Sequence, residues 1–396
     1  MIFARMKILF VIPKMEIAGT ERQLHYLAAG LKRRGHDVGI VCVRRLGRMG
    51  EILVNEGFDV RVLGFERPYD PRIVKAMEDV LAAFKPDILQ TFLFGFHLWT
   101  GLAGRRAKVP FIVSSRRELP GWKKWYHALY ENIGNCSADA VVCNSRAVES
   151  FVLKTERNVG GKTRVIHNGI PERAAPGSDT RTDGIVVIGM VANFYPQKEQ
   201  SLLLEAVGMI KRRFPGIRVR FAGGGLLMDE VKRRSAALGL NDIVEFLGVR
   251  EDVFDLLGSF DIFVHASKTE GFPNVVMEAL MAQRPVVASR VGGIPEIIDE
   301  GKTGILVPAS DAGALAGALI WCVEHPAERA AMGRRGRESV LARFSVETMV
   351  SAYEGLYNER LKQKAKAVDG RRWRERPKTE NRRQKPEENI REQQKS

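Results

Sequence analysis

Residues Asp261–Ile298 read DIFVHASKTEGFPNVVMEALMAQRPVVASRVGGIPEII and carry the strongest indication of the fold. The short apolar run Ile262–His265 predicts a buried strand, and the loop after it contains the sequence EGFP, which begins at Glu270. Asn274 then stands where a helix is expected to begin, and Glu278 lies in the first turns of that helix. Strand, loop and helix in this order are the repeating unit of a parallel α/β sheet.

The same alternation of short apolar runs and longer amphipathic segments continues on both sides of this stretch. In the first half, strands are predicted at Ile8–Ile12, Val38–Val43, Val60–Leu63, Ile88–Leu93, Phe111–Ser114, Ala140–Cys143 and Thr163–Ile166. In the second half, they are predicted at Ile185–Val191, Arg218–Phe221, Val244–Phe246, Ile262–His265, Val286–Ala288 and Gly304–Val307. Helical segments such as Glu21–Lys32 and Asp70–Phe84 lie between strands, so we expect two parallel-sheet α/β domains.

The polar, turn-rich stretch Pro171–Gly184 separates the two patterns, which places a first domain at 1–178 and a second at 179–345. A helix is predicted at 346–362, because apolar residues recur there at helical spacing. These residues are Val346, Met349, Val350, Tyr353, Leu356 and Tyr357. Residues 369–396 are almost all charged or polar, and a disordered basic tail is predicted at 363–396.

The net charge of +15 is unevenly distributed along the 396 residues. It is +11 over residues 1–178, −3 over 179–358 and +7 over 359–396, so an anionic partner is expected to meet the first domain or the tail. Within the first domain, aromatic and cationic side chains stand together at Trp122, Lys123, Lys124 and Trp125. This composition is typical of a membrane interface, and the alternative is an amphipathic helix whose aromatics pack against its own domain.

The chain lacks the motifs of several other classes of protein. Four cysteines, none in a C-x-x-C pair, are too few for a disulfide framework and favour a reducing compartment. The sequences typical of zinc proteases, α/β-hydrolases and ordinary dinucleotide-binding domains are missing. Without a signal-peptide core or ~18 consecutive apolar residues, we expect a cytoplasmic protein that can act peripherally at the inner face of the cell membrane.

Glu270 and Glu278 are the two ends of an E-x7-E pattern, and their surroundings resemble the retaining glycosyltransferases of family four, which have the GT-B fold. The resemblance implies that Glu278 holds the donor ribose hydroxyls and that Glu270 lies beside the transferred sugar. The backbone at Gly271, Phe272, Asn274 and Val275 would line the sugar and phosphate. Gly292, Gly293 and Glu296 continue the family pattern, with a packing or nucleotide-wall role.

Other segments extend the resemblance from Lys7 to about Tyr357. Met15–Glu21 is similar to the family's first glycine-rich loop, with Gly19 where a donor phosphate approaches. Thr20 and Gln23 also fit a capping box, a purely structural explanation of the same residues. Val165–Ile170 resembles the signature that ends the first domain, in which Asn168-Gly169 is interpreted as a turn. In the second half, Gly224 belongs to a loop similar to the one against which the donor base packs.

Two positions depart from the family pattern. The loop at Gly189–Leu204 resembles the one that offers an Arg and a Lys to the donor diphosphate, and Lys198 matches the lysine while Asn193 replaces the arginine. Arg116, followed by Arg117, stands where many members have a histidine. An arginine cannot act as a general base but can bind a phosphate of donor or acceptor, and a surface arginine pair is an equal alternative.

Taken together, the resemblance implies a GT-B glycosyltransferase whose C-terminal helix crosses back to the first domain. The expected donor is a nucleotide sugar, with UDP as the nucleotide, and the expected acceptor is a glycan or a polyprenyl-diphosphate-linked glycan. The implied transfer uses no metal or other cofactor, and nucleic acid is not an expected partner. Two alternatives stay open: a nucleotide-sugar epimerase of the same architecture, and a binding-only protein that docks on a membrane or nucleic acid.

Overall fold

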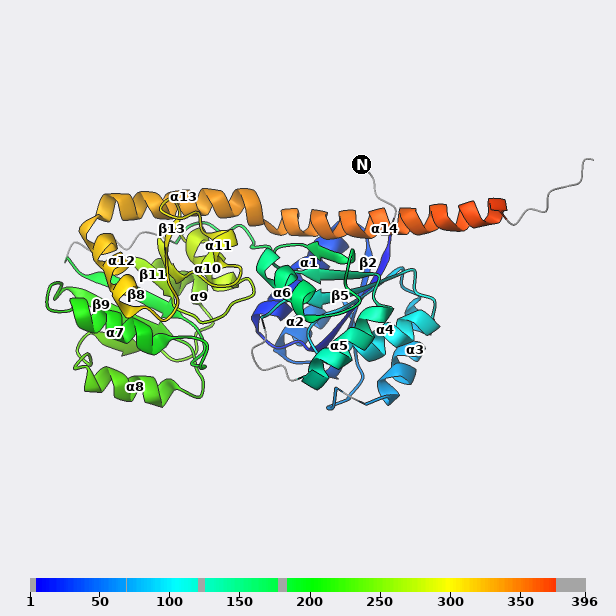
Figure 1. The fold of residues 1–396 in the computed structure, drawn as a ribbon, viewed down its shortest axis with the longest axis horizontal. Helices are drawn as coiled ribbons and strands as arrows, with labels where there is room; N and C mark the ends of the chain where they lie inside the picture. Colours follow the sequence, from blue (N-terminus) through cyan, green and yellow to red (C-terminus); the bar gives the residue numbers. More distant parts are fainter. Residues whose placement is uncertain (1–4, 69, 120–124, 177–183, 375–396) are drawn as a thin grey trace, which may run out of the picture.

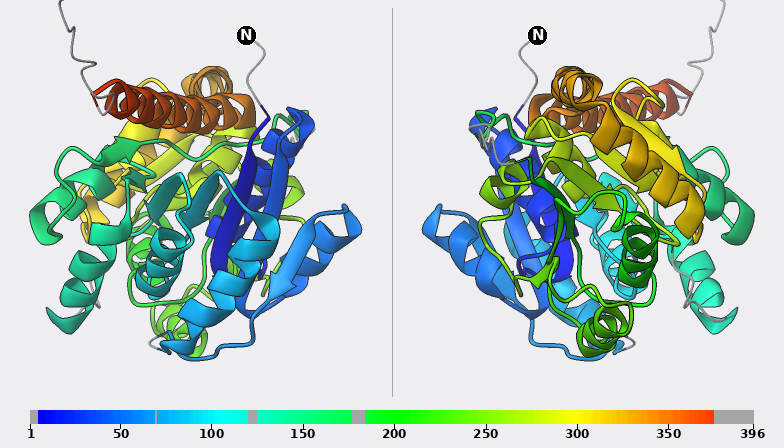
Figure 2. Two further views of the ribbon diagram at one scale, coloured as in Figure 1. Left: turned by 90° about the vertical axis from the view of Figure 1, so that its right-hand side faces the viewer. Right: turned by 90° about the vertical axis from the view of Figure 1, so that its left-hand side faces the viewer.

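The computed structural model describes residues 5–68, 70–119, 125–176 and 184–374, with side chains through Lys364 except that of Trp125. It consists of two lobes, each built around one parallel sheet (Figure 1). The expected pair of parallel-sheet domains is confirmed. Helices lie on both sides of each sheet, as the end-on views show (Figure 2).

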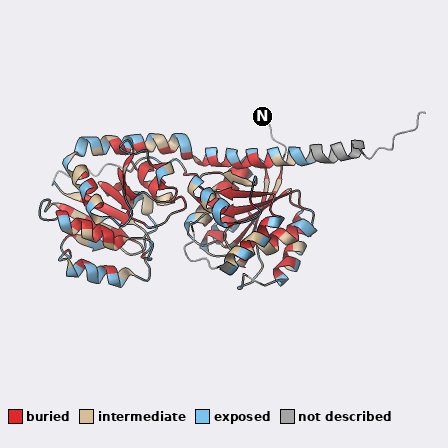
Figure 3. Ribbon diagram, viewed as in Figure 1, coloured by how far each residue is buried: buried red, intermediate tan, exposed pale blue. Residues whose placement is uncertain are grey.

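The first lobe contains a seven-stranded sheet in the order β3-β2-β1-β4-β5-β6-β7. Its strands are β1 (Lys7–Lys14), β2 (Asp37–Arg45), β3 (Asp59–Val62), β4 (Ile88–Thr91), β5 (Phe111–Arg116), β6 (Ala140–Cys143) and β7 (Thr163–Val165). All neighbouring pairs are parallel. The central strands are buried on both faces (Figure 3), which explains why they appear in the sequence as unbroken apolar runs.

The second lobe contains a six-stranded parallel sheet in the order β10-β9-β8-β11-β12-β13. Its strands are β8 (Val186–Val191), β9 (Ile217–Ala222), β10 (Val244–Phe246), β11 (Ile262–His265), β12 (Val286–Ser289) and β13 (Gly304–Val307). In both sheets the strand order reverses beside the first strand, between β1 and β4 and between β8 and β11. Loops that leave such a point in opposite directions open a crevice at the carboxyl ends of the strands, where ligands bind.

The helices connect these strands and cover both faces of each sheet. The first lobe has α1 (Gly19–Arg33), α2 (Arg48–Asn55), α3 (Arg72–Phe84), α4 (His97–Arg106), α5 (Trp125–Ser137) and α6 (Arg146–Thr155). The second has α7 (Gln200–Ile210), α8 (Met228–Ala237), α9 (Val253–Gly258), α10 (Asn274–Met281), α11 (Ile294–Ile297), α12 (Ala312–Glu324) and α13 (Pro326–Phe344). The last helix, α14 (Val346–Arg374), runs along the first lobe (Figure 1).

The crossing of α14 back to the first domain is confirmed. The six apolar residues that the sequence analysis named in this helix, Val346 to Tyr357, are all buried in the core of the first domain. They pack there with residues of α1, β1 and β5. The buried Glu354 adds polar contacts, because it accepts from His36 Nε2 at 2.8 Å and from Arg34 Nη1 at 2.7 Å. Ile170 and Ser345 form a parallel bridge where the chain passes from α13 to α14.

The predicted end of this helix at residue 362 was wrong, because α14 continues to Arg374. Seven of the twelve added residues are Lys, Arg or Ala and none is proline, so the composition of the segment favours a helix. Residues 375–396 of the predicted tail lie outside the described residues, as does the predicted domain boundary between 178 and 179.

Two local predictions were also wrong. The N-cap of α1 is Ala18 and no side chain caps it, because the amide of Gln23 bonds to the backbone of Gly169 instead. Asn168 and Gly169 form no turn but belong to an irregular stretch between β7 and the bridge at Ile170. Both residues use their polar groups for contacts with distant parts of the chain.

Gly30 lets α14 pack closely on α1. A Cβ atom at this position would lie 2.4 Å from Val350 Cγ2, whereas one at Gly355 on the exposed side of α14 would meet nothing within 4 Å. We expect Gly30→Ala to destabilise the first domain by ~1–3 kcal/mol through overpacking. Gly355→Ala should instead stabilise α14 by up to ~1 kcal/mol, because alanine favours a helix. Urea unfolding followed by circular dichroism measures both, and equal effects of the two changes would contradict the packing.

Candidate active site

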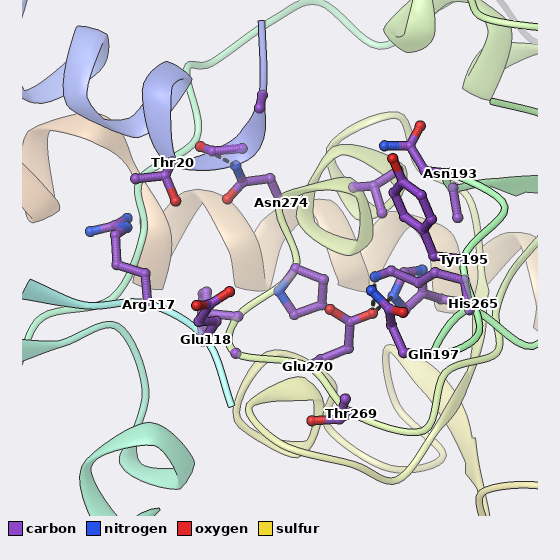
Figure 4. Close-up of a pocket in the computed structure, with 18 of the residues that line it drawn as sticks. Thr20, Arg117, Glu118, Asn193, Tyr195, Gln197, His265, Thr269, Glu270 and Asn274 are labelled. Carbon is purple, nitrogen blue, oxygen red and sulfur yellow. Dashed lines mark hydrogen bonds and ion pairs between the residues drawn. The ribbon is translucent and has the colours of Figure 1, made fainter. Parts of the chain in front are cut away.

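A cleft of about 960 Å³ lies between the carboxyl ends of the two sheets. Its walls come from both domains. Figure 4 shows Thr20, Arg117 and Glu118 of the first domain facing Asn193 and His265 of the second. The N-termini of α1 and α10 both reach the cleft, at Gly19 and Asn274 respectively, so free backbone amides of two helices are directed toward it.

Glu270 is the centre of a buried polar group at the second-domain wall. Its Oε1 atom accepts a hydrogen bond from Nε2 of His265, at 2.7 Å, and also pairs with the ammonium of Lys198. Among the described residues nothing bonds to the other oxygen, Oε2. One carboxylate oxygen is therefore fixed by protein groups, and the second can accept a hydrogen bond from a ligand.

These neighbours set the charges of the group. Burial alone would raise the pKa of Glu270, but His265 and Lys198 outweigh it and lower this pKa to about 2. Burial lowers the pKa of His265, against the opposing effect of Glu270, so we take this ring as neutral with the proton on Nε2. Lys198 then carries the positive charge that holds Glu270 ionised.

Glu278 lies on α10 with its side chain 17% exposed. Burial raises its pKa, while the positive charges of Arg22 and Arg173 oppose this increase. Arg22 belongs to α1 in the first domain and lies with its Nη1 atom 3.3 Å from Glu278 Oε1. The two carboxylates of the E-x7-E pattern thus have different environments. Glu270 is paired within its own domain, and Glu278 is paired across the cleft.

Asn274 joins the two domains at the start of α10. Its Nδ2 donates to the carbonyl of Gly19 at 3.0 Å. Its Oδ1 accepts from Asn168 Nδ2 at 2.8 Å and from Gln23 Nε2 at 3.3 Å. The first turn of α10 is therefore held against the first turn of α1.

Glu296 makes a second connection between the domains. It lies on α11 and accepts the backbone N–H groups of Arg146 and Ala147, each at 3.0 Å, at the start of α6. His167 Nε2 lies 2.8 Å from the same carboxylate. Glu296 therefore satisfies a helix N-terminus of the other domain and connects the two domains.

The glycines of the second-domain loops permit close packing behind Glu270. A Cβ atom on Gly292, whose φ is +52°, would lie 1.7 Å from the carbonyl oxygen of Glu270. A Cβ atom on Gly271 would lie 2.3 Å from the carbonyl oxygen of Arg117 in the first domain. Gly292 and Gly293 thus allow close packing, one of the two roles expected of them, while Gly271 lets the two domains meet.

Arg116 is not brought to the cleft, which corrects its assignment to a phosphate or sugar. The side chain is buried inside the first domain, where Nη2 pairs with Glu131 and Nε with Glu156. Its Nη2 also donates to Asn135 at 2.9 Å. Arg117, the next residue, does line the cleft, and it donates a hydrogen bond to Asn168.

The other predicted residues divide into three groups. Asn193, Lys198, Phe272 and Val275 line the cleft together with Gly19, Gly271, Asn274 and both glutamates. Gly224 is not among the lining residues, and a Cβ atom at this position would lie 2.9 Å from Val249 Cγ2. Trp122, Lys123 and Lys124 lie outside the described residues, and Trp125 is the first residue of α5.

Arg22, Asn168 and His265 are among the cleft residues that the sequence analysis did not assign to the site. A polar residue at the end of a buried strand, as His265 is on β11, is a usable signal because ligands bind at carboxyl ends. Within the described ranges no group of His, Cys, Asp and Glu side chains is arranged to hold a metal ion. Across the same residues, every helix is too short or too polar to traverse a lipid bilayer.

Two parallel-sheet domains facing a cleft, with the last helix crossing back, define the GT-B class of fold. Residues 177–339 match the profile of the group 1 glycosyl transferases, and residues 17–173 match that of glycosyltransferase family 4. The chain is 30% identical over 341 residues to the putative glycosyltransferase EpsD of Bacillus subtilis, covering 79% of this chain and 88% of EpsD. It therefore belongs to the family 4 glycosyltransferases.

Two further proteins are similar. The lipopolysaccharide core biosynthesis glycosyltransferase LpsE of Rhizobium meliloti is 29% identical over 225 residues, which are 55% of this chain and 63% of LpsE. The chain thus aligns with less than two thirds of that relative. Among solved structures, Anabaena Alr3699/HepE in complex with UDP superimposes with a TM-score of 0.78 at 23% identity, over 89% of this chain and 100% of HepE.

The charge of Glu270 predicts a pH-dependent contribution to stability. Because its folded-state pKa of about 2 lies below the ordinary value of 4.5, the ionised carboxylate stabilises the fold fully above pH 4.5. This contribution is lost as the pH falls from 4.5 toward 2. We expect the difference in free energy of unfolding between the unmodified chain and Glu270→Gln to shrink over that range. Urea unfolding at a series of pH values measures it, with the exposed Glu66→Gln as control; a pH-independent difference would contradict the assignment.

Proposed function

We propose that this protein transfers a sugar, with retention of anomeric configuration, from a UDP-sugar to a glycan or polyprenyl-diphosphate-linked glycan during assembly of a surface polysaccharide. The observation that carries the proposal is the arrangement of Lys198, Glu270 and Glu278 around the N-terminus of α10. It combines a cation and free amides for a diphosphate with carboxylate oxygens for hydroxyl groups.

Each part of a UDP-sugar, namely the ribose, the diphosphate and the sugar, has a partner in this arrangement. Glu278 accepts hydrogen bonds from the ribose hydroxyls, and the amides at Asn274 and Val275 bind the diphosphate. Glu270 Oε2 accepts from a hydroxyl of the transferred sugar. Asn193, which is exposed on the cleft wall, donates a neutral hydrogen bond where the family usually has an arginine, so Lys198 supplies most of the positive charge.

Catalysis in this proposal is electrostatic. The bond between the anomeric carbon and the diphosphate oxygen breaks, and the electron pair leaves with the nucleoside diphosphate. Lys198 and the α10 amides stabilise the charge that develops there. The acceptor hydroxyl attacks from the same face and its proton passes to the departing phosphate oxygen, so no side-chain base is needed. The buried Arg116 takes no part.

The names and complexes of similar proteins support the substrates. LpsE is described as an enzyme of lipopolysaccharide core biosynthesis. Other structures of HepE contain UDP with glucose or UDP-glucose. A nucleotide-sugar epimerase, the alternative of the same architecture, would convert the donor in the absence of any acceptor.

An exposed apolar face of α5 supports a lipid-linked acceptor. Tyr126, Leu129 and Ile133 are 43%, 52% and 50% exposed and lie on one face of this helix, at spacings of three and four residues. The helix begins shortly after Leu119, a cleft-lining residue, and follows the Trp and Lys residues at 122–124. An exposed apolar stripe on a helix that follows aromatic and cationic residues in the sequence is typical of a helix lying in a membrane interface.

The donor assignment is tested by Glu278→Ala. Removing a charged hydrogen-bond acceptor should weaken UDP binding by ~1–3 kcal/mol, with the fold retained. Calorimetry with UDP and a panel of UDP-sugars measures this, followed by transfer assays with each sugar that binds. Glu230→Ala, which removes an exposed glutamate of α8 in the same domain, serves as the control.

Different results separate the alternatives. Unchanged UDP affinity in a folded Glu278→Ala protein would reject the ribose contact. Conversion of a labelled UDP-sugar to another sugar without acceptor would identify an epimerase, and the absence of any nucleotide binding would favour a binding-only protein.

The membrane assignment is tested by Leu129→Ser together with Ile133→Ser. Because both side chains would lie among lipid, we expect flotation with phosphatidylglycerol vesicles to fall by about tenfold or more. Lys123→Glu with Lys124→Glu should also weaken it, in a salt-dependent way. Met209→Ser with Leu226→Ser, which alters exposed apolar residues of the second domain, is the control. If removal of residues 365–396 abolishes flotation and the α5 changes leave it unaffected, the tail and not α5 binds the membrane.

A further inference from the structure

The strongest unassigned feature of the cleft is the ion pair between the domains, formed by Arg22 and Glu278. Both side chains line the cleft, and their exposed fractions are 29% for Arg22 and 17% for Glu278. An ion pair removed from solvent to this degree is screened less than a surface pair. Arg48 and Glu251 also pair across the domains but are exposed.

Arg22 reaches Glu278 because the residues on either side of it are fixed. The carbonyl of Gly19 accepts from Asn274, and the amide of Gln23 donates to the carbonyl of Gly169 at 2.7 Å. The first contact holds the first turn of α1 against α10, and the second fixes that turn to the last part of the first domain. The backbone that carries the Arg22 guanidinium is therefore already fixed. Because of this, less conformational entropy is lost when Arg22 pairs with Glu278.

The contact engages only one of the two carboxylate oxygens of Glu278. Arg22 donates to Oε1, and no described residue bonds to Oε2. A ribose diol needs an ionised, correctly turned carboxylate, because a protonated acid loses acceptor capacity. Arg22 supplies both conditions: it favours the ionised form and restrains the orientation of the group.

We propose that Arg22 is a positioning residue for nucleotide binding: it holds Glu278 in the orientation and ionisation state that accept the ribose hydroxyls. This inference rests on the proposed ribose contact of Glu278. It adds that a residue of the first domain prepares the nucleotide site of the second, so that full donor affinity requires the two domains to be closed on one another. Arg22 acts through Glu278 and not by contact with the nucleotide.

Several groups determine the charge of Glu278 and must enter the test. They are Arg22 on α1 and Arg173 in the segment after β7. The Tyr26 hydroxyl on α1 faces the same carboxylate, and burial together with Glu278 raises the pKa of Tyr26. Burial raises the pKa of Glu278 and Arg22 opposes this, so loss of Arg22 raises the pKa further. UDP binding in an Arg22 variant should therefore decline at a higher pH than in the unmodified protein as the solution is acidified.

The experiment is a double-mutant cycle with UDP as the probe, measured by calorimetry from about pH 5 to pH 8. Arg22→Gln should weaken UDP binding about tenfold at neutral pH and move the acidic decline upward, whereas Arg22→Lys should restore part of both. In the Glu278→Ala background, Arg22→Gln should change affinity little further. Arg44→Gln, which removes an exposed arginine paired with Glu66 in the first domain, is the matched control.

The outcomes are distinguishable. An equal loss from Arg22→Gln in both backgrounds would overturn the proposal, because Arg22 would then act on the nucleotide directly. Unchanged affinity and an unchanged pH profile in Arg22→Gln would overturn it as well. If Glu278→Ala alone leaves UDP affinity unchanged, the ribose contact fails and the role of Arg22 fails with it. Circular dichroism and unfolding midpoints establish that each variant is folded.

Discussion

The side chain of Asn274 is the contact on which the geometry of the cleft depends. Its amide bonds in three directions to the first domain, to Gly19, Gln23 and Asn168, while its backbone begins α10. The same residue thus connects the domains and forms the end of the helix that faces the cleft. Any relative movement of the two sheets changes the position of these helix amides.

The charges of the cleft are distributed between the domains in a consistent way. The carboxylates Glu270 and Glu278 and the cation Lys198 belong to the second domain, and Arg22 of the first domain pairs with Glu278. Glu270 is paired within its own domain, with Lys198 and His265. It therefore stays ionised whether the two domains are open or closed. Glu278 depends on a partner from the opposite wall, so the two carboxylates of the E-x7-E pattern respond differently to closure.

The sequence predicted most of the fold because its strands are buried on both faces and are therefore continuous apolar runs, as in β6 and β11. The failures concern polar residues whose partners are distant in the chain. Asn168-Gly169 has the local composition of a turn, yet tertiary hydrogen bonds determine its conformation. Arg116 and Arg117 were indistinguishable in the sequence, since successive residues of a strand point to opposite faces and a shift of one position exchanges them.

The return of α14 to the first domain has a consequence for the order of events during synthesis. The first sheet is complete at Val165, but its core also needs Val346 through Tyr357. At ribosomal speeds of ~5–20 residues per second, the nascent first domain waits roughly 10–40 s for the helix that seals it. The second sheet is finished at Val307 and packs against helices made immediately afterwards. The domain that is translated first is thus the last to acquire its complete core, and its unsealed apolar surface is available to chaperones throughout that interval.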